Sequence, residues 1–407
     1  MMKPKYIYIV ILLLFSIASL SAEGTQEQEK SLLPVYVSFN SGAGWVIPTN
    51  DFLQGENQTY YSTNTLKYAF TSRGDSWQDL AYGMPYYGVG LSQSLYGRDD
   101  ELGKPVSLFL FQGATISQFT PRFSLNYELE LGLSMNWKYY DPFTNPDNLV
   151  IGSSTNVHFA GNIYFKWRAS DRVDIHSGAS IAHFSNGTSQ QPNNGLNKGG
   201  AFVEVAYNFN HNDKIHSKLK QVDRSKFTPH FEQDVQFILS TRNVKIDTLQ
   251  TNMPDVYTDK QFDVYGLNYY IMRASRYNYR YGIGVEGLYD ESREAIIYNK
   301  EHPDNGNYYT VTELGDFKER LSLGVSARGE LVLPYYSIFF DVGVTILNRD
   351  KSNPLLSQAL GAKVYLANNL FGTFGVKTVY LSESQFLYWS LGYTINSKRN
   401  HWFRDRR

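Results

Sequence analysis

The feature that most constrains this chain is the run from Phe123 to Lys138, FSLNYELELGLSMNWK, in which two kinds of residue alternate without a break. Apolar residues occupy the odd positions, while Ser, Asn, Glu, Gly and Lys occupy the even positions. Successive side chains of a β-strand point to opposite faces, so the run predicts a strand with one apolar and one polar face. It is much longer than the roughly 5–6 residues usual in a strand of a soluble protein. When tilted, it is long enough to cross a bilayer.

Comparable runs recur in two series. The first series lies near 34–46, 62–73, 84–96, 105–118, 123–138, 152–168, 172–186 and 199–209. The second lies near 230–241, 262–273, 277–289, 317–333, 335–347, 357–367, 370–381 and 386–396. Lipid offers no hydrogen-bond partner to an open sheet edge, so such strands must close into a barrel. We expect an all-β, antiparallel transmembrane β-barrel fold of about sixteen strands, as one large barrel or two small ones, with a soluble β-sandwich as the alternative.

The N-terminus has the pattern of an export signal. Lys3 and Lys5 precede an apolar run from Tyr6 to Leu20, and the run is followed by small residues near Ala22. This pattern predicts a secretory signal peptide over residues 1–22; a single membrane anchor is the alternative, but the run is shorter than the roughly 18 residues that a spanning helix needs. An exported chain with 32 Tyr and 32 Gly is typical of a barrel in the bacterial outer membrane.

Composition argues against several other classes of function. The chain has no cysteine, which excludes disulfides, thiol catalysis and thiolate metal sites. Its net charge of −1 gives no basic surface for a nucleic-acid partner. The histidines lack metal-ligand spacing, and Asp304 to Asn307 matches only a fragment of a calcium loop, so we interpret it as a turn and expect no metal site.

A polar, charged segment, HNDKIHSKLKQVDRSK at 211–226, separates the two series. We therefore expect three parts: the signal peptide 1–22, a first barrel half 23–210 and a second barrel half 211–407. The candidate chemistry lies only in the first half, so we expect the second half to be structural.

That chemistry lies in the stretch IAHFSNGTSQQPNNGLN at 181–197. Within the strand 172–186, His183 and Ser185 share the face of apolar residues that should point to lipid. Their α-carbons should lie about 6.6 Å apart, close enough for the imidazole and the hydroxyl to meet. Asn197 has the same phase in the next strand, unless a bulge at Gly199 and Gly200 breaks the register.

These residue types suit nucleophilic catalysis. An imidazole that takes the serine proton makes the hydroxyl a nucleophile, and a third group on the other ring nitrogen fixes the tautomer. Asn197 can fill that third role. The hypothesis is an ester hydrolase whose substrate is a membrane lipid. The alternative is a His and a Ser at the barrel rim that bond only to loop backbone.

Two motifs resemble a known family. His183-Phe184-Ser185-Asn186-Gly187, followed by Pro192-Asn193-x-Gly195-Leu196, resembles the lipid A 3-O-deacylase (acyloxyacyl hydrolase-like) family of outer-membrane proteins. The resemblance extends through 82–114, 123–138 and DPFTNPDNLVIGS at 141–153. It implies an eight-stranded barrel with its active site on the outer wall. It further implies Ser185 as the nucleophile, His183 as the base, and Asn186 and Asn193 as oxyanion-stabilising residues.

One position departs from that family. Asn197 stands where the family's best-known form has a glutamate, and in this it is similar to the His-Ser-Asn triad of outer-membrane phospholipase A, which calcium assists. We therefore expect a serine-dependent hydrolase that removes an acyl chain from lipid A or a related lipid. A phospholipase A-like enzyme, with calcium as its cofactor, is the first alternative. A channel or structural barrel without catalysis is the second. The sequence leaves the oligomeric state open.

Overall fold

The computed structural model describes residues 35–48, 59–72, 74, 76–209, 227–244, 260–301, 308–348, 355–367, 369–380 and 383–396. The expected signal peptide 1–22, the segment 211–226 and the expected turn at 304–307 lie outside these residues. Among the described residues, the helices are short, and none has the length and apolar character to cross a bilayer: α3 (Trp77–Ala81) and α4 (Asp99–Leu102).

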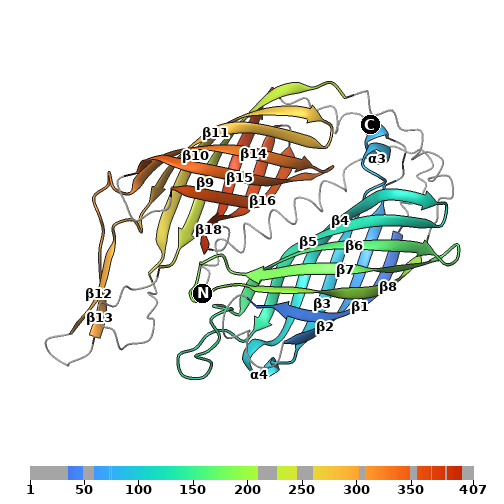
Figure 1. Ribbon diagram of the computed structural model, residues 1–407, viewed down its shortest axis with the longest axis horizontal. Coiled ribbons are helices and arrows are strands. Elements are labelled where there is room, and N and C mark those ends of the chain that lie inside the picture. Colours follow the sequence, from blue (N-terminus) through green and yellow to red (C-terminus); the bar gives the residue numbers. More distant parts are fainter. Residues whose placement is uncertain are drawn as a thin grey trace. The chain divides into compact units, whose positions relative to one another are not determined.

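The first barrel is closed by antiparallel pairing of each strand with its neighbours in sequence and of β1 with β8 (Figure 1). Its strands are β1 (Val35–Ile47), β2 (Tyr60–Thr71), β3 (Tyr86–Tyr96), β4 (Gly103–Thr120), β5 (Phe123–Trp137), β6 (Thr155–Arg168), β7 (Val173–Ser185) and β8 (Leu196–Asn208). The alternating run at 123–138 is β5, as predicted.

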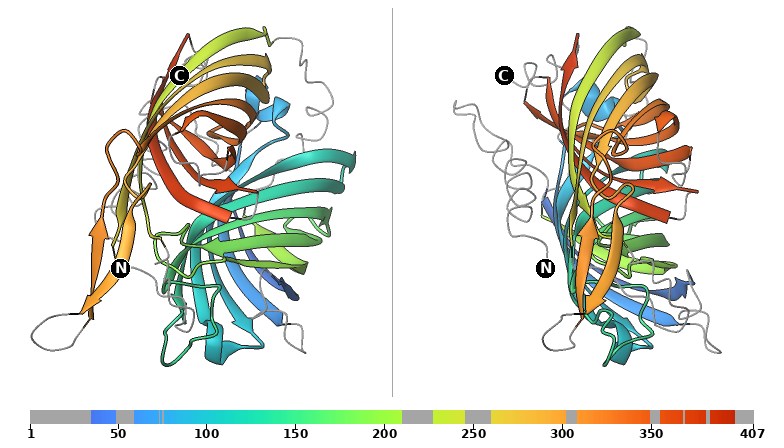
Figure 2. Two further views of the ribbon diagram at one scale, coloured as in Figure 1. Left: turned by 60° about the vertical axis from the view of Figure 1, so that its left-hand side comes forward. Right: turned by 90° about the vertical axis from the view of Figure 1, so that its left-hand side faces the viewer.

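A second, separately closed barrel follows. It consists of β9 (His230–Arg242), β10 (Phe262–Arg276), β11 (Tyr279–Asp290), β14 (Leu321–Val332), β15 (Tyr336–Asn348), β16 (Leu356–Ala367), β17 (Leu370–Val379) and β18 (Glu383–Ile395). The choice between one large barrel and two small ones is thus settled as two barrels of eight strands. The prediction missed a hairpin, β12 (Ile296–Glu301) and β13 (Tyr308–Glu313), which extends beyond β11 and β14 (Figure 2).

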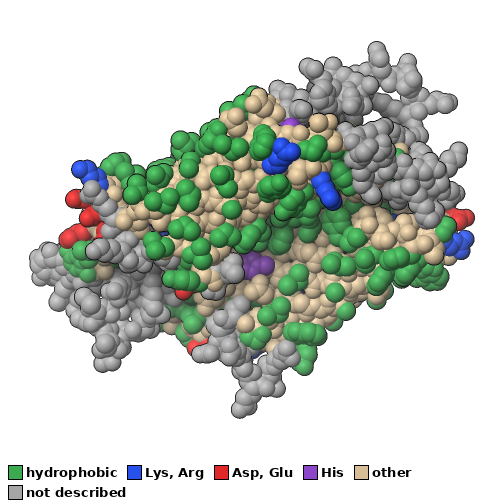
Figure 3. All heavy atoms as spheres, turned by 45° about the horizontal axis from the view of Figure 1, so that its top comes forward, with side chains coloured by type: hydrophobic (Ala, Val, Ile, Leu, Met, Phe, Trp, Pro, Cys, Tyr) green, Lys and Arg blue, Asp and Glu red, His purple; other side chains and the backbone are tan. Residues whose placement is uncertain are grey.

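The outer walls are apolar. On β7, Asp174, His176, Ala182 and Phe184 are buried in the lumen, and the odd-numbered residues of the strand face outward. Leu66, Ile163 and Val203 are more than half exposed on the first barrel, as is Ile283 on the second. On the face seen in Figure 3, hydrophobic side chains are widespread over the described residues, and few charged ones interrupt them. This is the surface that lipid requires of a barrel.

Ion pairs fill the lumen of the first barrel. Lys67 Nζ contacts Glu128 and lies 3.0 Å from Glu204 Oε2. His158 Nε2 lies 3.1 Å from Glu130 Oε2, and His176 Nδ1 lies 2.9 Å from Glu204 Oε1. Both histidines face the lumen and are buried. An eight-stranded barrel is just wide enough for such side chains to fill it.

The lumen of the second barrel is filled in the same way. Arg280 lies within 3.1 Å of carboxylate oxygens of Glu232, Asp234 and Glu330. Arg328 binds both carboxylate oxygens of Asp341 at 2.7 Å. Opposite charges paired in this way offset much of the cost of removing each charge from water.

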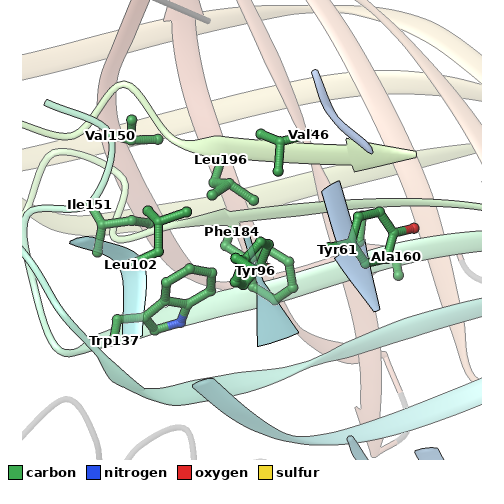
Figure 4. Packing of buried hydrophobic residues seen from close by; sticks show 11 residues of the cluster. Val46, Tyr61, Tyr96, Leu102, Trp137, Val150, Ile151, Ala160, Phe184 and Leu196 are labelled. Atoms are coloured by element: carbon green, nitrogen blue, oxygen red, sulfur yellow. The ribbon is translucent and has the colours of Figure 1, made fainter. Parts of the chain in front are cut away.

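A buried apolar cluster closes the first barrel at the end where β7 finishes and β8 begins. It joins Phe184 and Leu196 of these strands to Trp137 and to Val150 and Ile151 of the connection between β5 and β6 (Figure 4). Three of these residues are fully buried: Leu196, Val150 and Ile151. The cluster packs this connection against the hairpin that carries the candidate site.

Candidate active site

The β7–β8 hairpin places the three candidate residues on one face. The two strands pair without a shift up to Phe184 and Leu196, so no bulge at Gly199 or Gly200 breaks the phase. In this register His183 lies directly opposite Asn197. Ser185 lies two residues beyond His183 on the same strand and therefore on the same face.

His183 is hydrogen-bonded on both sides of its ring. Its Nδ1 lies 2.7 Å from Asn197 Oδ1, and its Nε2 lies 2.9 Å from Ser185 Oγ. An amide oxygen only accepts hydrogen bonds, so Nδ1 carries the ring proton. Nε2 is then free of a proton and accepts from the Ser185 hydroxyl. This is the tautomer that a general base needs.

The row of His183, Ser185 and Asn197 opens to the outer wall. His183 is exposed, and the other two are half-buried. The residues paired with them on the neighbouring strands are apolar: Phe159 lies opposite His183 on β6, and Ile47 lies opposite Asn197 on β1. An imidazole and a hydroxyl therefore meet among side chains suited to contact hydrocarbon.

Asn186 and Asn193 are both buried beside this row. The backbone N–H of Asn186 donates to Asn193 Oδ1 at 3.2 Å, and Asn186 Nδ2 donates to Ser153 Oγ at 3.2 Å. Asn193 Nδ2 has no hydrogen-bond partner among the described residues. A buried donor without a partner costs stability, and a functional role is one explanation for it.

Two contributors to the site had no role assigned from the sequence. Ser153 binds Asn186, as described above. Gly195 has a φ of +73°, and a Cβ there would lie 2.8 Å from His183 Cε1, so the backbone runs against the imidazole. The sequence signal was the motif itself, since Gly195 and Ser153 both fall within the stretches that carry the family resemblance.

No group of three or more His, Asp or Glu side chains is placed to hold a metal ion in the part of the chain that the structure describes. A calcium requirement stays a prediction tied to the phospholipase alternative.

Models of two protein families match the two barrels. The model of lipid A 3-O-deacylase (PagL) matches residues 56–206, and that of the acyloxyacyl hydrolase C-terminal domain matches residues 232–397. Most of the first barrel thus matches the lipid A 3-O-deacylase family, and the second barrel matches the acyloxyacyl hydrolase C-terminal domain. The resemblance read from the two motifs is thus confirmed. It is also extended, because the family matches reach the second barrel, which the motifs did not cover.

Two solved structures are similar to part of the chain. Neisserial surface protein A (NspA) is 10% identical, with 43% of this chain and 97% of that chain covered and a TM-score of 0.31. The outer membrane enzyme PagL is 18% identical, with 42% and 97% covered and a TM-score of 0.29. No curated protein sequence matches the chain.

Proposed function

We propose that this protein is an outer-membrane ester hydrolase that removes a fatty acyl chain from lipid A, with Ser185 as the nucleophile. The observation that carries the proposal is the hydrogen-bonded row of Ser185, His183 and Asn197 on an apolar outer wall. The match of residues 56–206 to the lipid A 3-O-deacylase family supports the substrate class.

The reaction follows from the tautomer. Ser185 Oγ attacks the ester carbonyl while its proton passes to His183 Nε2, and Asn197 Oδ1 holds the imidazolium through Nδ1–H. The tetrahedral intermediate collapses, and His183 returns the proton to the departing alkoxide. Water activated by His183 then hydrolyses the acyl-enzyme. Asn193 Nδ2, a buried donor without a partner among the described residues, is suited to stabilise the oxyanion together with Asn186.

The connections of the first barrel support a position in the outer leaflet. At the end opposite the site, the connections are the short turns 121–122 and 169–172 and the longer stretch 72–85, which contains α3. At the end with the site, the connections include the longer stretches 138–154 and 186–195. In outer-membrane barrels the short turns face the periplasm and the longer loops face outward. Ser185 would then lie near the outer headgroups, where an acylated glycolipid is accessible.

One observation favours a second candidate. The third member of the row is an amide, as in the phospholipase-like triad, so a glycerophospholipid is the alternative substrate. A channel is less well supported, because ion pairs occupy both lumens.

The test compares the two lipids directly. Purified wild type and Ser185→Ala are incubated in detergent with lipid A or with a glycerophospholipid, with calcium or with EDTA, and the products are identified by mass spectrometry. Loss of one acyl chain from lipid A by the wild type alone, in either buffer, supports the proposal. Calcium-dependent loss from the phospholipid alone supports the second candidate. If the wild type deacylates neither lipid, the proposal of an ester hydrolase is wrong.

A further inference from the structure

Asn148, in the connection between β5 and β6, has a side chain that is entirely buried and fully hydrogen-bonded. Its Nδ2 donates to the carbonyl oxygens of Glu101 at 3.0 Å and Lys138 at 3.1 Å. Its Oδ1 accepts from the backbone N–H groups of Val150 at 3.2 Å and Ile151 at 3.1 Å. One amide thus ties three segments of backbone together and uses both its donors and both its acceptor positions.

The backbone that Asn148 fixes in turn holds the start of β8. The carbonyl oxygen of Leu149 accepts from Asn194 N at 3.1 Å, and that of Val150 accepts from Gly195 N at 3.0 Å. Two consecutive hydrogen bonds of this kind define both the position and the direction of the 194–195 backbone. The buried side chains of Val150 and Ile151 lock the same segment into the apolar cluster (Figure 4).

This backbone borders the reacting groups. Gly195 runs against the His183 ring, where an added Cβ would lie 2.8 Å from Cε1. Asn193, whose Nδ2 has no partner in the part of the chain that the structure describes, lies two residues before Gly195. A displacement of the 194–195 backbone would therefore shift two things together: the backbone that packs against the His183 imidazole, and Asn193 Nδ2, the candidate oxyanion donor.

The geometry points to Asn148 as a positioning residue of the active site, acting through Leu149 and Val150 on Gly195, His183 and Asn193. This inference rests on the proposed hydrolysis by Ser185. Asn148 contacts no reacting atom, and its role is to fix geometry. Misplacement of reacting groups by about 1 Å can lower a rate by about a hundredfold.

Asn145 offers a matched control. It lies in the same connection, and its Nδ2 donates to the same Glu101 carbonyl at 2.9 Å and to Tyr139 O at 3.1 Å. Unlike the Asn148 side chain, the Asn145 side chain does not bond to the backbone of Val150 or Ile151, so its loss should leave the 149–151 backbone in place.

The experiment measures the folded full-length chain with two readouts. The variants are Asn148→Ala, Asn148→Leu, which keeps the volume without the hydrogen bonds, and Asn145→Ala. The first readout is kcat and KM for lipid A. The second is the rate constant with which an alkyl fluorophosphonate labels Ser185, recorded separately from the labelled fraction. A merely structural role lowers the labelled fraction, whereas a positioning role lowers the rate constant.

We expect both Asn148 variants to lose about ten- to a hundredfold in kcat and in labelling rate, with KM changed little, because the lipid-facing wall is untouched. Asn145→Ala should stay close to wild type. Equal rate constants in wild type and a folded Asn148 variant would overturn the inference, as would failure of both Asn148 variants to fold, which would make Asn148 a folding determinant. The absence of hydrolysis and labelling in wild type itself would instead refute the proposed function.

Discussion

At the scale of single residues, the Nδ1 side of His183 is held by a neutral amide. A carboxylate in this place would stabilise the imidazolium by charge, whereas the Asn197 oxygen offers only a hydrogen bond at 2.7 Å. The role left to Asn197 is to orient the ring and fix the tautomer, which leaves Nε2 facing Ser185.

Substituting Asn197 tests that role. Asn197→Ala should lower kcat about ten- to a hundredfold, because a hydrogen bond worth about 1.5–3 kcal/mol to the imidazolium is lost. Asn197→Asp, which keeps an acceptor oxygen in the same place, should retain activity. Steady-state kinetics with lipid A measure both. The exposed Asn64 of β2, replaced by alanine, is the control and should be unaffected. Full activity of Asn197→Ala would show that Asn197 has no role in catalysis.

Gly195 is required for two reasons, its φ of +73° and its contact with His183. Gly195→Ala should therefore cost about 1 kcal/mol of stability, since residues with a Cβ disfavour positive φ. It should also displace the imidazole and lower kcat by about a hundredfold. Gly161→Ala is the control, because an added Cβ there meets only Leu129 Cδ2 at 3.7 Å. Similar activities of the two variants would show that the ring tolerates the displacement.

At the scale of secondary-structure elements, strict alternation allowed the barrel strands to be predicted, because lipid outside and polar side chains inside impose period 2 on each strand. The hairpin of β12 and β13 was not predicted, because its strands are short and belong to neither barrel wall. The outward orientation of His183, Ser185 and Asn197 could also be predicted from the alternation alone, because the pairing of β7 with β8 has no register shift. The positioning role that we infer for Asn148 could not be predicted from the sequence. That role depends on the Glu101 and Lys138 carbonyl groups, which only the folding of the loops brings together.

The outer face of β8 provides a prediction at this scale. Val203 is about half exposed on the apolar wall, and in a membrane it would contact lipid. Val203→Lys should destabilise the barrel by about 2–4 kcal/mol if it lies near the bilayer midplane, because a charge is then buried in hydrocarbon. Urea unfolding from phospholipid vesicles measures the change, and Val203→Leu, which stays apolar, should unfold like wild type. Equal stability of the lysine and leucine variants would mean that this face does not contact lipid.

At the scale of the whole molecule, the number of barrels could not be predicted, because closure depends on pairs distant in sequence. The β1–β8 pairing closes one barrel, and the β9–β18 pairing closes the other. Alternation within each strand is the same in one large barrel and two small ones. The difference matters for function, since only a wide barrel leaves an aqueous channel.

Conductance in planar bilayers tests the filled lumens. Because ion pairs such as Lys67 with Glu204 and Arg280 with Glu330 occupy the two interiors, the purified chain should show no steady porin-like conductance. Ser185→Ala should behave identically, since Ser185 faces outward. A stable conductance of the size seen for a wide porin measured in parallel would show that at least one lumen is open.

The central claim, that an outward-facing serine is activated by His183, is tested most directly by mapping the site of covalent labelling. The folded chain is treated with an alkyl fluorophosphonate, digested and analysed by peptide mass spectrometry, in wild type and in His183→Ala. We predict a single modified residue, Ser185, in wild type and little or no modification in His183→Ala. Labelling of another serine, or equal labelling of Ser185 without His183, would contradict the claim.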